Sequence, residues 1–264
     1  MNTIVTKFGG SSLADSIHFK KVKNIIEGNS ERKYVVPSAP GKRFSKDFKV
    51  TDLLYLCHAH VNSGISLDDV FKLISERYHS IVNELDLNFD LNSHLEIIKK
   101  DIENGASVDY AASRGEYLNG LILANYFGID FIDAKDVIKF NKYGSLNMEE
   151  TYSLLKDKLS IHERAVIPGF YGSDEHGDIV TFSRGGSDVT GALVAASINA
   201  KLYENWTDVS GFLMADPRIV NNPKKIKTIT YGELRELSYM GASVLHEEAV
   251  FPVRTSGIPI NIRN

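Results

Sequence analysis

Cysteine is almost absent from the sequence, which contains one, Cys57, among 264 residues. A single thiol excludes an intrachain disulfide and a cysteine-based zinc cluster, and it suits a reducing compartment. Cys57 ends the apolar stretch 53–57, so we expect a buried, inert thiol and not a nucleophile.

An excess of positive charge is also missing. Lysine and arginine number 30 against 34 acidic residues, which gives a formal net charge of −4 and leaves no global basic surface for a nucleic-acid backbone. The first residues lack the cationic start and apolar stretch of a signal peptide, and no apolar run approaches the ~18 residues of a membrane span. We therefore expect a cytoplasmic protein without nucleic-acid or membrane partners.

What is present is enough apolar sequence for a sizeable core, since 43% of the residues are hydrophobic. Short β-rich runs alternate with helical patterns, which predicts a largely parallel sheet with helices on both faces. The predicted strands are 4–8, 34–36 and 164–167, and the predicted helices are 16–27, 52–62 and 149–158. Region 66–104 is predicted to be mostly helical, and its apolar stripe is assigned to the core: Val70, Leu73, Ile74, Tyr78, Ile81 and Val82.

A glycine pair follows the first predicted strand, in the turn 9–12 that leads to a helix starting near 13–16. Paired glycines let the backbone approach a ligand, and unpaired amides at a helix start favour anions. Lys7 lies at the carboxyl end of the strand, where open α/β sheets bind ligands. A lysine beside such a turn suits a transferring phosphate, although the turn taken alone favours a plain strand-to-helix connection. It is neither a Walker A motif nor a dinucleotide fingerprint.

A second glycine pair lies between a predicted strand, 179–182, and an alanine-rich helix, 189–198. The turn reads Ser183-Arg184-Gly185-Gly186-Ser187-Asp188. Arginine suits bidentate capture of a carboxylate or phosphate, and aspartate can orient Mg²⁺, an ammonium group or the lysine of the first turn. The alternative is that Ser187 or Asp188 only caps the helix.

Three further segments carry weaker signals. The predicted strand 201–206 ends at Thr207-Asp208, and 215–218 reads Ala-Asp-Pro-Arg. These residues fit a nucleotide pocket or a proline turn with a surface ion pair. Thr51 is predicted to cap a helix, and Glu116 precedes the helical pattern 117–125, where it could bind an ammonium or be an ordinary first-turn glutamate. The segment 41–49 is predicted to be an exposed basic loop that attracts phosphate or is simply solvated.

Taken in order, these motifs resemble the aspartate kinases of the amino-acid kinase family. The matching segments are Lys7 to Ser12, Ser38-Ala39 with Thr51 to Leu54, Ser113 to Glu116, Arg184 to Asp188, Trp206 to Val209 and Asp216 to Arg218. The resemblance implies a three-layer α/β/α sandwich with a mostly parallel central sheet and two lobes. The lobe 1–175 would bind aspartate and the lobe 176–264 would bind ATP. The implied reaction transfers the γ-phosphoryl group of MgATP to the side-chain carboxylate of L-aspartate, giving 4-phospho-L-aspartate on the way to lysine, methionine and threonine.

The resemblance also assigns roles. Lys7 would contact the phosphates, with amides from Gly9, Gly10 and Ser11, and Asp188 would organise the lysine and the metal region. Arg184 would bind the α-carboxylate of aspartate and Glu116 its α-ammonium. The implied substrate pocket is completed by Ser38, Thr51 and Ser187, and the implied nucleotide contacts are Thr207, Asp208, Asp216, Arg218, Ser243 and Val244. The nucleophile is an ionised carboxylate, so the reaction needs no general base.

Two departures accompany the resemblance. Ser243 and Glu247 stand where the family usually has a lysine and a proline; a serine hydroxyl and the Val244 backbone could still serve the nucleotide. The small regulatory ACT domains are expected to be absent, so that the chain is a catalytic fragment or a short unregulated form, with a homodimer possible. The alternatives are a sibling kinase acting on glutamate, N-acetylglutamate, carbamate or UMP, and a catalytically silent binding module.

Overall fold

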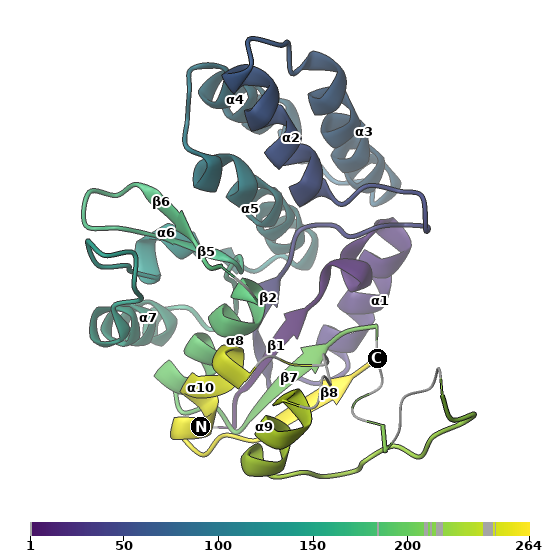
Figure 1. The fold of residues 1–264 in the computed structure, drawn as a ribbon, viewed down its shortest axis with the longest axis vertical. Helices are drawn as coiled ribbons and strands as arrows, with labels where there is room; N and C mark the ends of the chain where they lie inside the picture. The colour runs from purple at the N-terminus through teal and green to yellow at the C-terminus, as the bar shows by residue number, and fades with distance from the viewer. Residues whose placement is uncertain are drawn as a thin grey trace.

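A six-stranded parallel sheet lies at the centre of the computed structural model, in the order β3-β4-β2-β1-β7-β8 (Figure 1). The structure describes residues 2–183, 185–208, 211, 213–214, 219–239, 245 and 247–264. The strands are β1 (Ile4–Phe8), β2 (Arg32–Pro37), β3 (Asp130–Phe131), β4 (Ala165–Val166), β7 (Leu202–Trp206) and β8 (Ile260–Arg263). Each adjacent pair is parallel, as the alternation of strand and helix patterns predicts.

Strand β1 is buried along its whole length because β2 and β7 flank it and helices cover both faces. Alternate residues of the central strands enter two separate cores. Phe8 and Val35 belong to one apolar cluster, whereas Val5 and Val36 belong to the other. Since neighbouring side chains of a strand point to opposite faces, the two clusters lie on opposite sides of the sheet. The expected three-layer sandwich is confirmed.

The first cluster is built with helices that follow β1 and β2. They are the short 3₁₀ helix η1 (Gly10–Leu13), α1 (Ser16–Glu27), α2 (Val50–Asn62), α3 (Asp68–Glu84), α4 (Leu91–Glu103) and α5 (Val108–Phe127). Helices α2 to α5 gather at the top of Figure 1. The predicted core stripe of α3 is buried except for Leu73, which is 45% exposed. That assignment was wrong because successive helix residues are turned by about 100°, so Leu73 points outward while Ile74 faces the core.

The second cluster contains the remaining helices. They are α6 (Ala134–Val137), α7 (Met148–Ile161), α8 (Gly186–Ser197), α9 (Tyr231–Tyr239) and α10 (Glu247–Thr255). Helix α8 packs against β1, β2 and β7, with α7 and α10 packed on α8. In the described part of the chain, no helix is both long and apolar enough to cross a membrane.

The predicted strand 179–182 is confirmed as β6 (Ile179–Thr181), which pairs with β5 (Tyr171–Ser173) in a separate antiparallel hairpin outside the central sheet. Two other local predictions were wrong. Thr51 does not cap α2, since the chain becomes helical after Lys49. Glu116 does not precede a helix; it lies inside α5, whose cap is Ser107. Around Glu116 the buried face of α5 consists largely of alanine and glycine. The first turns of this helix therefore lack the regular spacing of large apolar residues by which a helix is predicted.

Candidate active site

Lys7 and Asp188 meet at the carboxyl edge of the sheet. Lys7 Nζ lies 2.8 Å from Asp188 Oδ1. Lys7 is fixed in β1 and is 7% exposed, and Asp188 lies in the first turn of α8. The turn before α8 places Gly185 at φ +56°, a left-handed conformation that glycine adopts readily. No side chain caps this helix, so the capping alternative for Ser187 and Asp188 is wrong.

Asn205 completes this ion pair. It sits beside Lys7 in the register of β1 and β7, and its Nδ2 donates to Asp188 Oδ1 at 2.8 Å. Both contacts end on Oδ1, so Oδ2 has no hydrogen-bond partner among the described residues. One carboxylate oxygen is therefore available, and oxygen ligands are the kind that Mg²⁺ prefers. Asp188 Oδ2 would therefore hold a magnesium ion, which would supply positive charge to phosphate oxygens.

The glycine turn after β1 presents two free backbone donors. The first bond of η1 runs from the Ser12 N–H to the Gly9 carbonyl at 3.0 Å. The N–H groups of Gly10 and Ser11 precede that bond and have no acceptor in the described ranges, so they can bind an anion. The Gly9 N–H, which was also expected to contact phosphate, is not free. It donates to the Trp206 carbonyl at 2.9 Å and so continues the hydrogen bonding of the sheet.

The turns after β1 and β2 touch through glycines. The Gly41 N–H donates to the Gly10 carbonyl at 2.8 Å. A Cβ on Gly10 would lie 2.8 Å from the Ala39 carbonyl oxygen, and one on Gly41 would lie 2.6 Å from the Gly10 carbonyl carbon. Neither position has room for a side chain, so the two turns hold each other at a fixed distance.

Glu116 is a buried carboxyl group without a cation partner among the described residues. It is 5% exposed, and its Oε2 has no hydrogen-bond partner. Burial raises the pKa of Glu116 to about 8, although a hydrogen bond from the Ala39 N–H and the charge of Arg114 oppose the rise. A positively charged group arriving at this carboxyl would favour its ionised form.

The other predicted substrate residues surround the same edge. The Ser38 N–H donates to the Phe8 carbonyl at 3.0 Å, which joins the ends of β1 and β2. Ser187 packs on Gly169, where an added Cβ would lie 2.6 Å from the Ser187 Cβ. Thr51 is half-buried in the first turn of α2, a helix that packs against α5.

The structure does not bring every predicted residue to Lys7. Thr207 and Asp208 follow β7 on the side of β8: the Thr207 N–H donates to the Arg263 carbonyl at 2.8 Å, and Asn264 Nδ2 donates to the Asp208 carbonyl at 3.0 Å. The predicted residues outside the described ranges are Arg184, Asp216, Arg218, Ser243 and Val244.

Two asparagines of the site escaped the sequence analysis. Asn205 was assigned only to a strand, and Asn119 lies one turn after Glu116 on α5, where its Nδ2 donates to the Ser38 carbonyl at 2.6 Å. Both are buried. A polar residue inside an otherwise buried element is the signal that could have found them. The prediction for Cys57 is confirmed, since the thiol is fully buried and burial raises its pKa to about 12.

Comparisons with known proteins show the family to which this chain belongs. The model of the amino acid kinase family matches residues 2–264. Aspartokinase 3 of Bacillus subtilis is 40% identical over 277 residues, which cover 98% of this chain and 60% of that protein. The crystal structure of Clostridium acetobutylicum aspartate kinase is 66% identical with a TM-score of 0.95, over 99% of this chain and 60% of that one.

E. coli aspartokinase III, solved with aspartate and ADP, is 26% identical with a TM-score of 0.84, over 99% of this chain and 61% of that one. The chain thus spans about 60% of the length of these relatives. The resemblance of the motifs to aspartate kinases is confirmed, and the chain belongs to the amino acid kinase family.

Proposed function

We propose that this chain phosphorylates the side-chain carboxylate of L-aspartate with ATP, giving 4-phospho-L-aspartate and ADP. The observation that carries the proposal is the ion pair at 2.8 Å between the buried Lys7 and the half-buried Asp188, beside the free amides of Gly10 and Ser11. These groups are what a phosphoryl transfer needs, because its catalysis consists mainly of positioning and charge stabilisation.

The chemistry follows from the charges. The attacking oxygen belongs to a carboxylate that is already ionised at neutral pH, so no residue has to remove a proton. This oxygen forms a bond to the γ-phosphorus while the bond to the ADP oxygen breaks. The Lys7 ammonium and the two amides would stabilise the negative charge on the transferring group. Magnesium, when bound, neutralises phosphate charge, and Asp188 Oδ2 would hold it.

Glu116 supports an amino acid as the acceptor. Its carboxyl group lies buried without a cation partner in the described chain, and the α-ammonium of aspartate would supply one. An acyl-capped amine could not, which disfavours N-acetylglutamate. The E. coli relative was solved with aspartate and ADP, which is consistent with these two ligands. Arg184 stays the predicted partner of the α-carboxylate.

Several finer statements rest on the resemblance alone. We propose that residues up to 175 mainly bind aspartate and those from 176 mainly bind nucleotide. We also propose that the product enters lysine, methionine and threonine synthesis in the cytoplasm, and that the chain can form homodimers. Thr51, Ser38 and Ser187 keep their predicted substrate roles.

An acceptor panel tests the function. ADP release would be measured with L-aspartate, L-glutamate, N-acetyl-L-glutamate, carbamate and UMP, and hydroxylamine would trap an acyl phosphate as a hydroxamate. Turnover with aspartate and a trapped hydroxamate are expected. Activity with another acceptor and none with aspartate would reject the proposal. Calorimetric binding of both ligands without ADP release would instead favour a silent binding module.

Lys7→Ala tests the catalytic role within the same assay. We expect kcat to fall by about 10³-fold, the size seen when one preorganised charge-stabilising donor is lost. Lys20→Ala, at an exposed position of α1, is the matched control and should retain wild-type kinetics. Normal turnover by the Lys7 variant would show that this ammonium does not serve the phosphate.

A further inference from the structure

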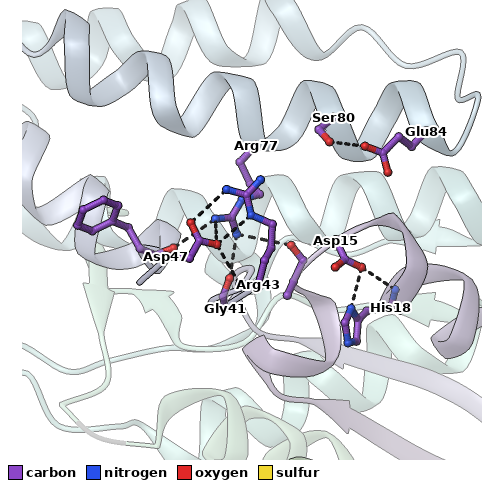
Figure 2. A network of polar contacts seen from close by, with 10 residues as sticks. Asp15, His18, Gly41, Arg43, Asp47, Arg77, Ser80 and Glu84 are labelled. Atoms are coloured by element: carbon purple, nitrogen blue, oxygen red, sulfur yellow. Dashed lines mark hydrogen bonds and ion pairs between the residues drawn. The ribbon is translucent and has the colours of Figure 1, made fainter. Parts of the chain in front are cut away.

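The segment 41–49 is held from inside by one buried acid. Most of this segment is exposed, as its sequence predicts, but Asp47 is only 6% exposed. Figure 2 shows two arginines converging on its carboxylate. Arg43 donates through Nε at 2.9 Å and Nη2 at 3.1 Å, and Arg77 Nη2 donates at 2.5 Å. These hydrogen bonds keep the pKa of Asp47 well below its usual range. The exposed loop that the sequence predicts is therefore confirmed, with an internal anchor at Asp47.

Arg77 connects this segment to the phosphate-binding turn. It lies on α3, is 4% exposed, and its Nη1 donates to the Gly41 carbonyl at 2.8 Å, with the Ala14 carbonyl 3.5 Å away. Gly41 in turn donates to the Gly10 carbonyl. Gly10 and Ala14 stand at the two ends of η1, so the guanidinium of Arg77 contacts one end of this helix at Ala14 and is linked to the other through Gly41.

The turns that contain Gly10 and Gly41 are in close backbone contact. Because a Cβ on either Gly10 or Gly41 would collide with backbone atoms of the other turn, a displacement of Gly41 is transmitted to Gly10. The neighbouring Tyr78 donates through its hydroxyl to the Gly115 carbonyl at 2.7 Å, next to Glu116. Helix α3 thus supports the two sides of the site through adjacent residues.

We infer that Arg77, anchored by Asp47, is a positioning residue that sets the Gly10 and Ser11 amides for the phosphates of the nucleotide. The inference rests on the proposed function for its ligand. Arg77 does not itself reach the phosphates in this assignment; it acts through Gly41 and Ala14. Removing the Arg77 guanidinium should weaken nucleotide binding and the stabilisation of the transferring phosphoryl group. Binding of aspartate should stay largely unchanged.

Arg77→Met tests the inference in the full chain. We expect at least a tenfold rise in KM for ATP and a lower kcat, with KM for aspartate changed less than twofold. Arg43→Gln is the matched control: it also removes donors from Asp47 but touches neither Gly41 nor Ala14, so KM for ATP should stay within twofold of wild type. Equal kinetic losses in the two variants, or a loss confined to KM for aspartate, would overturn the inference.

Two further measurements guard against a folding defect. Arg77→Lys keeps a cation opposite Asp47 but not the guanidinium that reaches both carbonyls through Nη1 while Nη2 binds Asp47. It should raise KM for ATP at least threefold; an unchanged KM would contradict the inference. Amide hydrogen exchange of residues 9–14 should accelerate in Arg77→Met while that of α5 stays constant. Uniform acceleration, or none, would also contradict it. The exchange result stands even if wild type fails to phosphorylate aspartate, which would reject the proposed function alone.

Discussion

Replacing Glu116 by glutamine should change how the stability of the protein depends on pH. Burial raises the pKa of Glu116 from 4.5 to about 8, so unfolding releases a proton between these values. For an acid whose folded pKa is raised, the native state is least affected below pH 4.5 and is increasingly destabilised as pH rises toward 8. From the two pKa values, this cost grows by about 2.5 kcal/mol between pH 5 and pH 7, since one pKa unit corresponds to about 1.4 kcal/mol.

Urea unfolding at pH 5, 6 and 7 would measure this difference without ligands. The free energy of unfolding of Glu116→Gln minus that of wild type should rise by about 2.5 kcal/mol over the range. Any constant cost of burying the glutamine amide cancels in this comparison. A difference that stays flat within about 0.5 kcal/mol would refute the raised pKa of the buried Glu116 carboxyl. In wild type, aspartate binding at pH 7 should release close to one proton, because the α-ammonium needs the ionised carboxylate.

The remaining predictions concern the two glycine turns. Asn205→Leu should lower kcat by about 10- to 100-fold, because a hydrogen bond to the charged Asp188 contributes about 1.5–3 kcal/mol; steady-state kinetics would measure it, and an unchanged kcat would show that Lys7 alone orients that carboxylate. Gly10→Ala should destabilise the protein by about 1–3 kcal/mol in thermal unfolding, because its Cβ would meet the Ala39 carbonyl at 2.8 Å. Gly232→Ala, at an open position of α9, should be neutral or stabilising by up to about 1 kcal/mol; equal losses in both would contradict the crowding at Gly10.

The fold and the Lys7–Asp188 pair were within reach of the sequence. Helix 16–27 and strand 4–8 were predicted with the bounds that the structure gives, because clear apolar periods and turn residues coincide there. Glycine pairs that follow strands indicate turns at the carboxyl edge of the sheet, where ligands bind. That Lys7 and Asp188 touch needed the resemblance to known kinases, since spacing alone does not fix which strands are neighbours.

The rest depends on contacts between distant segments. Residues 41–49 look solvated because four cations and two aromatic residues of the segment are exposed. The anchoring role of Asp47 becomes visible only with Arg77, about thirty residues later in the sequence. The sequence does not tell the hairpin of β5 and β6 apart from strands of the parallel sheet, because a strand of three residues is too short to show an alternation of apolar and polar residues. Asn119 and Asn205 gained meaning only from Ser38 and Asp188, their partners across the fold.

The position of β1 in the sheet has a consequence for synthesis of the protein. Strand β1 is synthesised long before β7, its neighbour on the side away from β2, which ends at residue 206. Until β7 is made, one edge of β1 has no partner strand. The ammonium of Lys7 likewise has no ion-pair partner until Asp188, about 180 residues later, has been synthesised. Until β7 has been synthesised, the nascent chain therefore exposes an unpaired, apolar strand edge, and at this stage binding by a chaperone would most protect it from aggregation.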